Sequence, residues 1–142
     1  MTLHQTIEAY HSAVDAFARG DASPAKQLCA HSDDVLLANP FGPAVRGWSR
    51  VSQALDAASS TFREGRVDRF ERLVEFASGD LAIIFEVERW NAKVRGRDQL
   101  TPFTLRVTTT FRREHDEWKM VHRHADPIAD AHPDGPLRAT GA

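Results

Sequence analysis

The chain has 142 residues, 42% of them hydrophobic and 27% charged, and its 18 lysines and arginines nearly balance 20 acidic residues. This composition is typical of a single soluble globular domain, and the small net charge does not favour a nucleic-acid-binding or membrane-surface protein. The single cysteine, Cys29, excludes an internal disulfide. The first residues do not resemble a signal peptide and no apolar run is long enough to cross a bilayer, so we expect a cytoplasmic protein.

The first half of the chain predicts three helices and one short strand. A capping-box pattern and apolar residues at helical spacing predict a helix over residues 2–20. A serine followed by a proline opens a second helix over residues 23–30, with the serine as its N-cap. A short apolar run at 34–39 favours a strand, and apolar residues recurring from position 51 indicate a third helix that ends near Gly65.

From residue 67 onward the apolar period changes to two, which is typical of strands. Strands are expected over residues 67–77, 81–94 and 103–111, and a last strand over 118–125. The order of helices followed by strands predicts an α+β domain over residues 1–128, in which the helices cover one face of the sheet. Residues 129–142, which are rich in Ala, Pro, Gly and Asp, are predicted to form a mobile tail.

Two segments carry a family resemblance. The segment 33–43, with Gly47 after it, and the final strand with Trp118, His122 and His124 resemble the nuclear transport factor 2-like superfamily. Its members include ketosteroid isomerase, the SnoaL-like polyketide cyclases and the association domain of calcium/calmodulin-dependent protein kinase II. The resemblance covers nearly the whole chain. It implies a cone-shaped fold, with three N-terminal helices packed on a curved antiparallel sheet, a small-molecule pocket and a homodimer.

The residues that carry ketosteroid isomerase chemistry do not match this chain. The position of the isomerase's general base is occupied by Asn39, whose amide cannot accept a proton at neutral pH. The positions of the two oxyanion donors fall on Ala13 and Val107. The arginines that line the pocket of the kinase association domain map to Val87, Thr109 and Ala125, so that anion site is not carried over either.

Both alignments predict which face of the last strand points into the pocket. Arg123 is expected inward together with Val121 and Ala125, whereas Trp118, Met120, His122 and His124 are expected outward. A buried guanidinium needs a negative partner. Arg123 therefore binds either a carboxylate or enolate of a ligand, or an acidic side chain in a structural ion pair.

The strand over residues 81–94 offers a second inward cation. Arg89 faces the pocket if Val87 does, and it is then a ligand-binding candidate. Leu81, Ile83, Phe85 and Val87 share one face of this strand. The same alternation turns Glu86, Glu88 and Trp90 outward, where a large aromatic residue suggests a partner surface.

Other candidate site residues lie on the first helix, at the pocket mouth and on the strand over residues 103–111. Asn39, Phe41 and Trp48 are expected at the mouth, where Asn39 either orients a carbonyl or water or caps the turn before the next proline. Tyr10 either donates a hydrogen bond into the cavity or packs in the core. Thr109 lies on the inward face of its strand.

His122 and His124 lie two apart on one strand and thus on the same face. This spacing can chelate a metal, but with no fixed third ligand it more often marks a packing or dimer surface. His124 is also expected to pair with Asp126 or with the backbone. We predict no metal and no cofactor.

These patterns predict a small-molecule-binding domain, with isomerase, cyclase or dehydratase chemistry on an apolar carbonyl or carboxylate compound as its activity. In that case Asn39 and Tyr10 would position the substrate and Arg123 would stabilise an oxyanion. No strong general base is visible in the predicted pocket. The alternative is a non-catalytic ligand-sensing or homo-oligomeric assembly domain, which would be favoured if Phe41, Phe85 and Phe111 filled the cavity.

Overall fold

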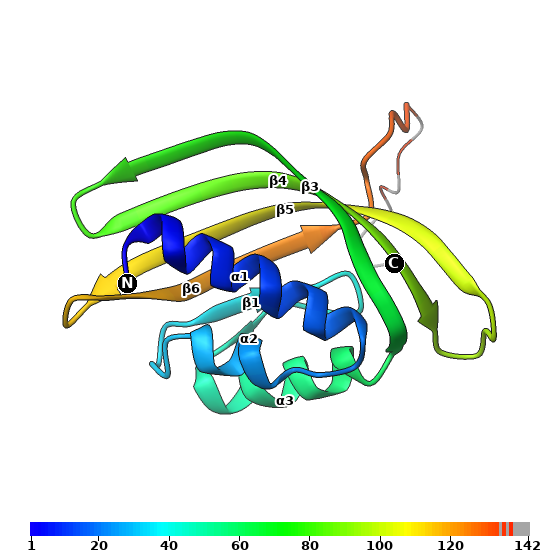
Figure 1. Ribbon diagram of the computed structural model, residues 1–142, viewed down its shortest axis with the longest axis horizontal. Helices are drawn as coiled ribbons and strands as arrows, with labels where there is room; N and C mark the ends of the chain where they lie inside the picture. Colours follow the sequence, from blue (N-terminus) through cyan, green and yellow to red (C-terminus); the bar gives the residue numbers. More distant parts are fainter. Residues whose placement is uncertain (134, 136, 138–142) are drawn as a thin grey trace.

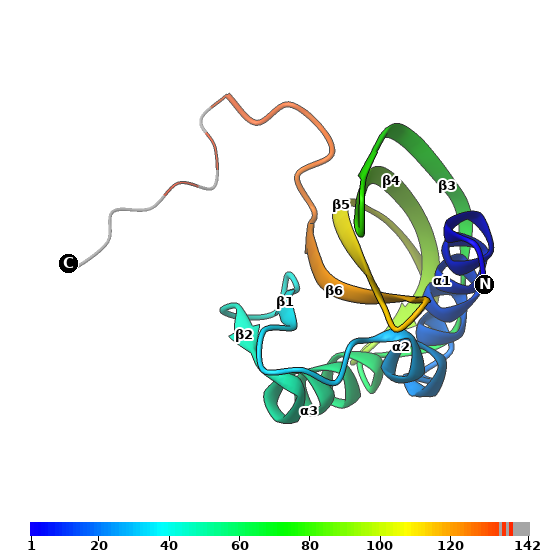
Figure 2. The same ribbon diagram turned by 90° about the vertical axis from the view of Figure 1, so that its left-hand side faces the viewer.

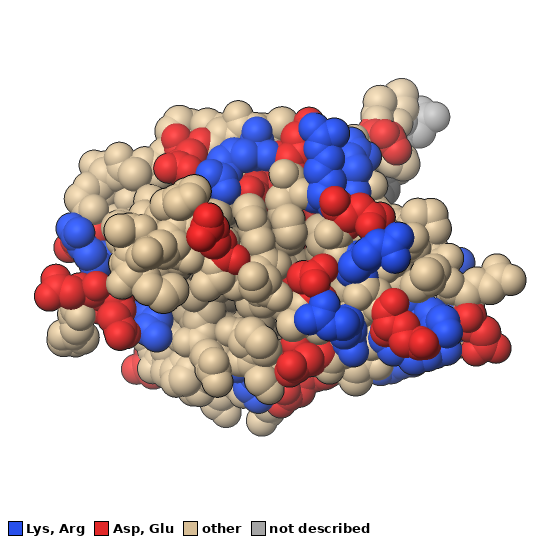
Figure 3. All heavy atoms as spheres, in the orientation of Figure 1, with Lys and Arg blue, Asp and Glu red and all other residues tan. Residues whose placement is uncertain are grey.

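The computed structural model describes residues 1–133, 135 and 137, and shows three helices packed beside a curved sheet (Figure 1). Of the predicted mobile tail, residues 134, 136 and 138–142 lie outside the described residues. Within the described residues, no helix is both long and apolar enough to cross a membrane. On the face drawn in Figure 3, acidic and basic side chains lie next to one another rather than in patches of a single sign.

All three predicted helices are present, and the first two begin where the sequence predicts. Helix α1 spans Leu3–Ala18 and opens with the expected capping box, in which Thr2 and Gln5 exchange hydrogen bonds of 2.9 and 3.1 Å. Helix α2 spans Ser23–Leu28 and has proline in its first turn, although Ala22 rather than the serine is its N-cap. Helix α3 spans Trp48–Ser59, so the predicted end near Gly65 is wrong.

Gly65 instead lies in a strand. Strand β3 spans Phe62–Ser78 and β4 spans Leu81–Val94, and their register shifts near Gly65, beside a positive φ of 54° at Glu64. A Cβ atom on Gly65 would lie 2.4 Å from the Cβ of Ala92 and 2.7 Å from the carbonyl oxygen of Ala18. The glycine is therefore required by a close approach of β3 to β4 and to the end of α1, and does not mark the end of a helix.

The sheet has six strands in the order β2-β1-β6-β5-β4-β3. Strands β5 (Leu100–Glu114) and β6 (Glu117–Asp126) continue the antiparallel meander, while β1 (Leu36–Ala38) and β2 (Val45–Arg46) extend its other edge. Strand β1 runs parallel to β6, so the sheet is mixed rather than purely antiparallel. The strands curl around the helices (Figure 2), which confirms the predicted α+β cone.

The two faces of β4 are the reverse of the prediction. Glu86, Glu88 and Trp90 are buried on the concave face, whereas Arg89 is exposed on the convex face. The apolar residues Leu81 and Ile83 also lie on the convex face and are 49% and 37% exposed. The prediction that Arg89 points inward, and that Glu86, Glu88 and Trp90 point outward, is therefore wrong.

A β-bulge in β6 explains a second difference. Thr110 pairs with His122, but the next residue of β5, Phe111, pairs with Met120, so Val121 is an extra residue in β6. Met120 consequently turns inward and is buried, although simple alternation predicted it outward. Beyond the bulge the predicted faces are confirmed, because Arg123 and Ala125 reach the concave side.

Candidate ligand-binding site

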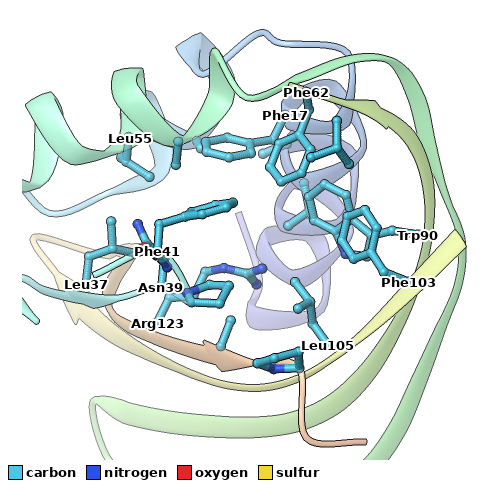
Figure 4. Close-up of a pocket in the computed structure, with 18 of the residues that line it drawn as sticks. Phe17, Leu37, Asn39, Phe41, Leu55, Phe62, Trp90, Phe103, Leu105 and Arg123 are labelled. Atoms are coloured by element: carbon cyan, nitrogen blue, oxygen red, sulfur yellow. Dashed lines mark hydrogen bonds between the residues drawn. The ribbon is translucent and has the colours of Figure 1, made fainter. Parts of the chain in front are cut away.

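A cavity of about 340 Å³ lies between the helices and the concave face of the sheet (Figure 4). Its walls are mostly apolar and aromatic side chains from α1, α3, β1, β3, β4, β5 and the loop after β1: Phe17, Leu37, Phe41, Leu55, Phe62, Trp90, Phe103 and Leu105. The polar side chains among the lining residues are Tyr10, Asn39, Arg97, Thr101 and Arg123. No carboxylate or imidazole of the described residues lines it.

Arg123 is the cation deepest in this cavity. Its guanidinium, from β6, meets the Glu88 carboxylate of β4 in a bidentate pair, with Nη1–Oε2 at 2.9 Å and Nη2–Oε1 at 3.0 Å. The Arg123 side chain is 13% exposed and that of Glu88 is fully buried. Burial by itself would lower the pKa of Arg123, but the negative charge of Glu88 and the hydrogen bonds raise it above its ordinary value. The guanidinium therefore stays charged.

Glu88 accepts hydrogen bonds from three side chains. Besides the two from Arg123, it receives one from the indole Nε1 of Trp90 at 3.0 Å and one from the hydroxyl of Tyr10 at 3.3 Å. The Tyr10 oxygen in turn accepts hydrogen bonds from Thr109, at 2.8 Å, and from Arg123. Burial raises the pKa of Tyr10, so its hydroxyl remains a donor. The buried charges are thus satisfied by partners from α1, β4, β5 and β6.

This network decides several of the predicted roles. Arg123 forms the structural ion pair that was one of its two predicted alternatives. Its partner is Glu88, whose side chain was predicted to point away from the pocket. The single hydroxyl proton of Tyr10 is donated to Glu88, so this arrangement leaves no proton for a ligand. Thr109 supports Tyr10 and is not among the residues that line the cavity. The signal that could have identified Glu88 was the need of an inward Arg123 for an acidic partner.

The predicted mouth residues separate into two groups. Asn39 and Phe41 line the cavity, and Asn39 Oδ1 accepts a hydrogen bond of 3.0 Å from the backbone of Phe41. This bond forms the predicted turn and leaves the Nδ2 donors of Asn39 free of it. Trp48 does not line the cavity but stacks on His31, with ring centroids 3.8 Å apart. Arg89 lies outside as well, 3.9 Å from Glu71.

The three phenylalanines that would have indicated a filled core leave the cavity open. Phe111 is fully buried against Tyr10, with an edge-to-face contact at 5.6 Å. Phe85 shares the outward face of β4 with Ile83. Phe41 is 54% exposed and lies at the cavity rim, 5.9 Å from the ring of Phe62. The filled cavity that would favour a non-catalytic assembly domain is therefore not observed.

A second buried carboxylate lies under α1, away from the lining residues of the cavity. Glu86 accepts hydrogen bonds from His11 Nε2, at 2.9 and 3.0 Å, and from Arg72, at 3.0 and 3.1 Å. The ring of His11 stacks on Phe70 at 3.9 Å. Burial raises the pKa of Glu86, but its hydrogen bonds and the charges of His11 and Arg72 outweigh burial and leave the pKa below its ordinary value. This cluster connects α1 to β3 and β4.

The two histidines of β6 lie on the convex face, as predicted. His122 Nδ1 and the hydroxyl of Thr110 are 3.0 Å apart, and burial, followed by the nearby His124, lowers the pKa of His122. Asp126 accepts a hydrogen bond from Arg106 at 2.7 Å rather than from His124. Within the part of the chain that the structure describes, no three residues of the types His, Cys, Asp or Glu are grouped to hold a metal.

Comparison with known proteins identifies the family. The model of the SnoaL-like domain matches residues 4–130. This chain belongs to the SnoaL-like domain family. Asn39 and Ala13, onto which the resemblance to ketosteroid isomerase maps the general base and one oxyanion donor, both line the cavity.

Solved structures agree on the fold of this SnoaL-like protein. A nuclear transport factor 2-like superfamily protein from Salmonella enterica serovar Typhimurium is 22% identical, with a TM-score of 0.75 over 91% of this chain and 90% of that one. A ketosteroid isomerase-like protein from Erwinia carotovora atroseptica is 18% identical, with a TM-score of 0.72 over 90% and 95% of the two chains. No curated protein sequence matches the chain. At these identities the likeness concerns the fold alone.

Proposed function

We propose that this SnoaL-like protein binds a small, largely apolar molecule in the cavity, and holds a polar oxygen of that molecule with Arg123 and Asn39. The observation that carries the proposal is the cavity itself: an open space of about 340 Å³ with an apolar wall and few polar groups. Such a combination is typical of small-molecule sites. The apolar wall supplies affinity at about 25 cal/mol for each Å² of apolar surface removed from water, and the polar groups supply orientation.

Binding without proton transfer fits the cavity better than isomerase, cyclase or dehydratase chemistry. Those reactions need a group that takes up or releases a proton near neutral pH. No carboxylate or imidazole of the described residues lines the cavity, and the pKa values of Tyr10 and Arg123 are both raised, further away from neutral pH. Glu88 would have to leave Trp90, Tyr10 and Arg123 to act as a base.

A thermal-shift screen of apolar carbonyl and carboxylate compounds tests this function. Ligands of the cavity should raise the Tm of the wild-type protein. Ala13→Leu, which extends a side chain into the cavity from α1, should abolish the shift. Ala57→Leu, on the exposed face of α3, is the matched control and should retain it. A shift that survives Ala13→Leu would place binding elsewhere and contradict the proposal.

We also propose a homodimer formed through the convex face of the sheet. Large apolar side chains are exposed there on two neighbouring strands: Phe76 of β3 pairs with Ile83 of β4 and is 62% exposed, and Leu81 lies beside them on the same face. An apolar patch of this kind on adjacent strands usually contacts a partner. Ile83→Asp should convert a dimer to a monomer in light scattering coupled to size-exclusion chromatography, whereas Leu100→Asp, away from this patch, should not.

A further inference from the structure

One edge of the Arg123 guanidinium is left unused by the protein. Of its five N–H groups, both on Nη1 are occupied, by Glu88 and Tyr10, and one on Nη2 is occupied by Glu88. The Nε–H and the second Nη2–H have no acceptor among the described residues. Because Nη1 is the nitrogen on the same side as Cδ, these two remaining N–H groups are neighbours and point in the same direction. They form an intact fork.

We propose that this fork binds the carboxylate of an apolar monocarboxylic acid. The inference rests on the proposed function of the cavity and names the class of its ligand. Two parallel N–H groups match the two oxygens of a carboxylate and form charge-assisted hydrogen bonds, which are stronger than those to a neutral carbonyl. Asn39 follows the end of β1, two residues after Leu37, which pairs with Arg123, and its amide N–H groups can also bind the carboxylate because Asn39 lines the same cavity.

The charge balance of the site also favours an anion. Glu88 neutralises Arg123, and its negative charge is already shared among Trp90, Tyr10 and Arg123. Arg97 lines the same cavity with its side chain exposed to solvent, and no acidic side chain of the described residues lines the cavity. The ionised side chains that line the cavity are therefore cations, and a carboxylate ligand would meet no negative charge among them.

Glu88 acts as a positioning residue for this fork. Glu88 binds the end of the guanidinium that carries Nη1 and Nη2, and leaves the edge that carries Nε and Nη2 free. Trp90 in turn donates a hydrogen bond to Glu88. The apolar body of the ligand would lie against an aromatic wall, where Phe103 stacks with Phe62 and Trp90 at centroid distances of 5.7 and 5.3 Å. Figure 4 shows these rings on one side of the cavity and Arg123 reaching into it from β6. A flat apolar body fits this arrangement.

Three matched probes test the inference by titration calorimetry at pH 7: 2-naphthoate, 2-acetonaphthone and naphthalene. The three share one ring system and differ in whether they carry a carboxylate, a neutral carbonyl or no oxygen. We expect 2-naphthoate to bind about tenfold more tightly than 2-acetonaphthone, since hydrogen bonds between charged groups exceed neutral ones by roughly this factor. Arg123→Lys keeps the charge but removes the fork, and should reduce that preference to about threefold or less. Arg89→Lys, on the convex face, should leave it unchanged.

Each outcome decides one question. If 2-acetonaphthone binds as tightly as 2-naphthoate, the carboxylate assignment is overturned while ligand binding in the cavity stands. If none of the three probes binds, the proposed function itself fails, and the inference fails with it. Should Arg123→Lys not fold, Arg97→Gln replaces it. That variant should weaken the binding of 2-naphthoate about threefold and leave the binding of 2-acetonaphthone unchanged. An equal effect on the binding of both probes would contradict the charge argument.

Discussion

Glu86 and Glu88 are two residues apart on β4, point to the same side of the sheet and are both buried, yet they have different surroundings. The partners of Glu86 reach solvent, with the His11 side chain 26% and the Arg72 side chain 31% exposed. The partner of Glu88 is itself buried and contacts the cavity. Glu86 therefore fixes α1 on the sheet, whereas Glu88 fixes the orientation of a cation beside the cavity. Two residues of the same type on one strand thus have different surroundings: Glu86 lies under a helix and Glu88 lies beside the proposed ligand site.

The largest difference between the two carboxylates should appear when each is made neutral. Glu88→Gln leaves the buried Arg123 without its counter-charge, and should lower the free energy of unfolding by about 3–5 kcal/mol. Urea denaturation at pH 7 measures it. Glu88→Gln should also weaken 2-naphthoate, because the guanidinium loses its fixed orientation. If the double variant Glu88→Gln with Arg123→Met regains the lost free energy of unfolding, the loss in Glu88→Gln is due to the unpaired charge of Arg123.

Glu86→Gln should lower the free energy of unfolding by less, about 1–3 kcal/mol, because Arg72 and His11 can turn toward water when the carboxylate is removed. The same denaturation curves give the value. A loss as large as that of Glu88→Gln would mean that exposure of the partners does not matter, and would remove the distinction between the two sites. Binding of 2-naphthoate should be unchanged in Glu86→Gln.

The Glu86 site should also give stability a pH dependence in acid. Its pKa in the folded protein lies below the ordinary glutamate value of 4.5. The ionised carboxylate therefore stabilises the fold fully above that ordinary value, and the contribution disappears as the pH falls through the lowered pKa. The stability advantage of wild type over Glu86→Gln, measured by urea denaturation, should shrink from pH 6 toward pH 3. An advantage that is constant over this range would contradict the cited direction.

Thr109→Val should produce the smallest effect, a loss of about 1 kcal/mol in the free energy of unfolding, because it removes a single hydrogen bond to Tyr10 while conserving shape. Tyr10 keeps its contacts with Glu88 and Arg123. Thr108→Val, on the opposite face of β5, is the matched control. If the two variants behave alike, Thr109 contributes nothing to the Glu88 network.

Strands β4 and β5 show what limits prediction from sequence. In β5 the polar threonines and arginine alternate with apolar residues, and the predicted inward face is confirmed by the burial of Leu105, Val107 and Phe111. In β4 the apolar residues Leu81 and Ile83 form the outward face and two glutamates point inward. An alternating pattern identifies the two faces of a strand, and the more apolar face is then predicted to be the buried one. That assignment fails where buried charges have partners and apolar side chains remain exposed on the opposite face.

The sequence by itself determined the starts of α1 and α2, the order of the four long strands along the chain and the family, and the resemblance to that family predicted the inward direction of Arg123. The helices and strands depend on local capping and on the apolar period, which can be read from neighbouring residues, whereas the family and the direction of Arg123 come from motifs shared with known proteins. Only the tertiary structure decided that Gly65 permits a close crossing, that a bulge turns Met120 inward, and that Glu88 is the partner of Arg123. Glu88 and Arg123 are 35 residues apart and Tyr10 is 113 residues from Arg123. Pairing across such separations is set by how the elements pack, which no local pattern encodes.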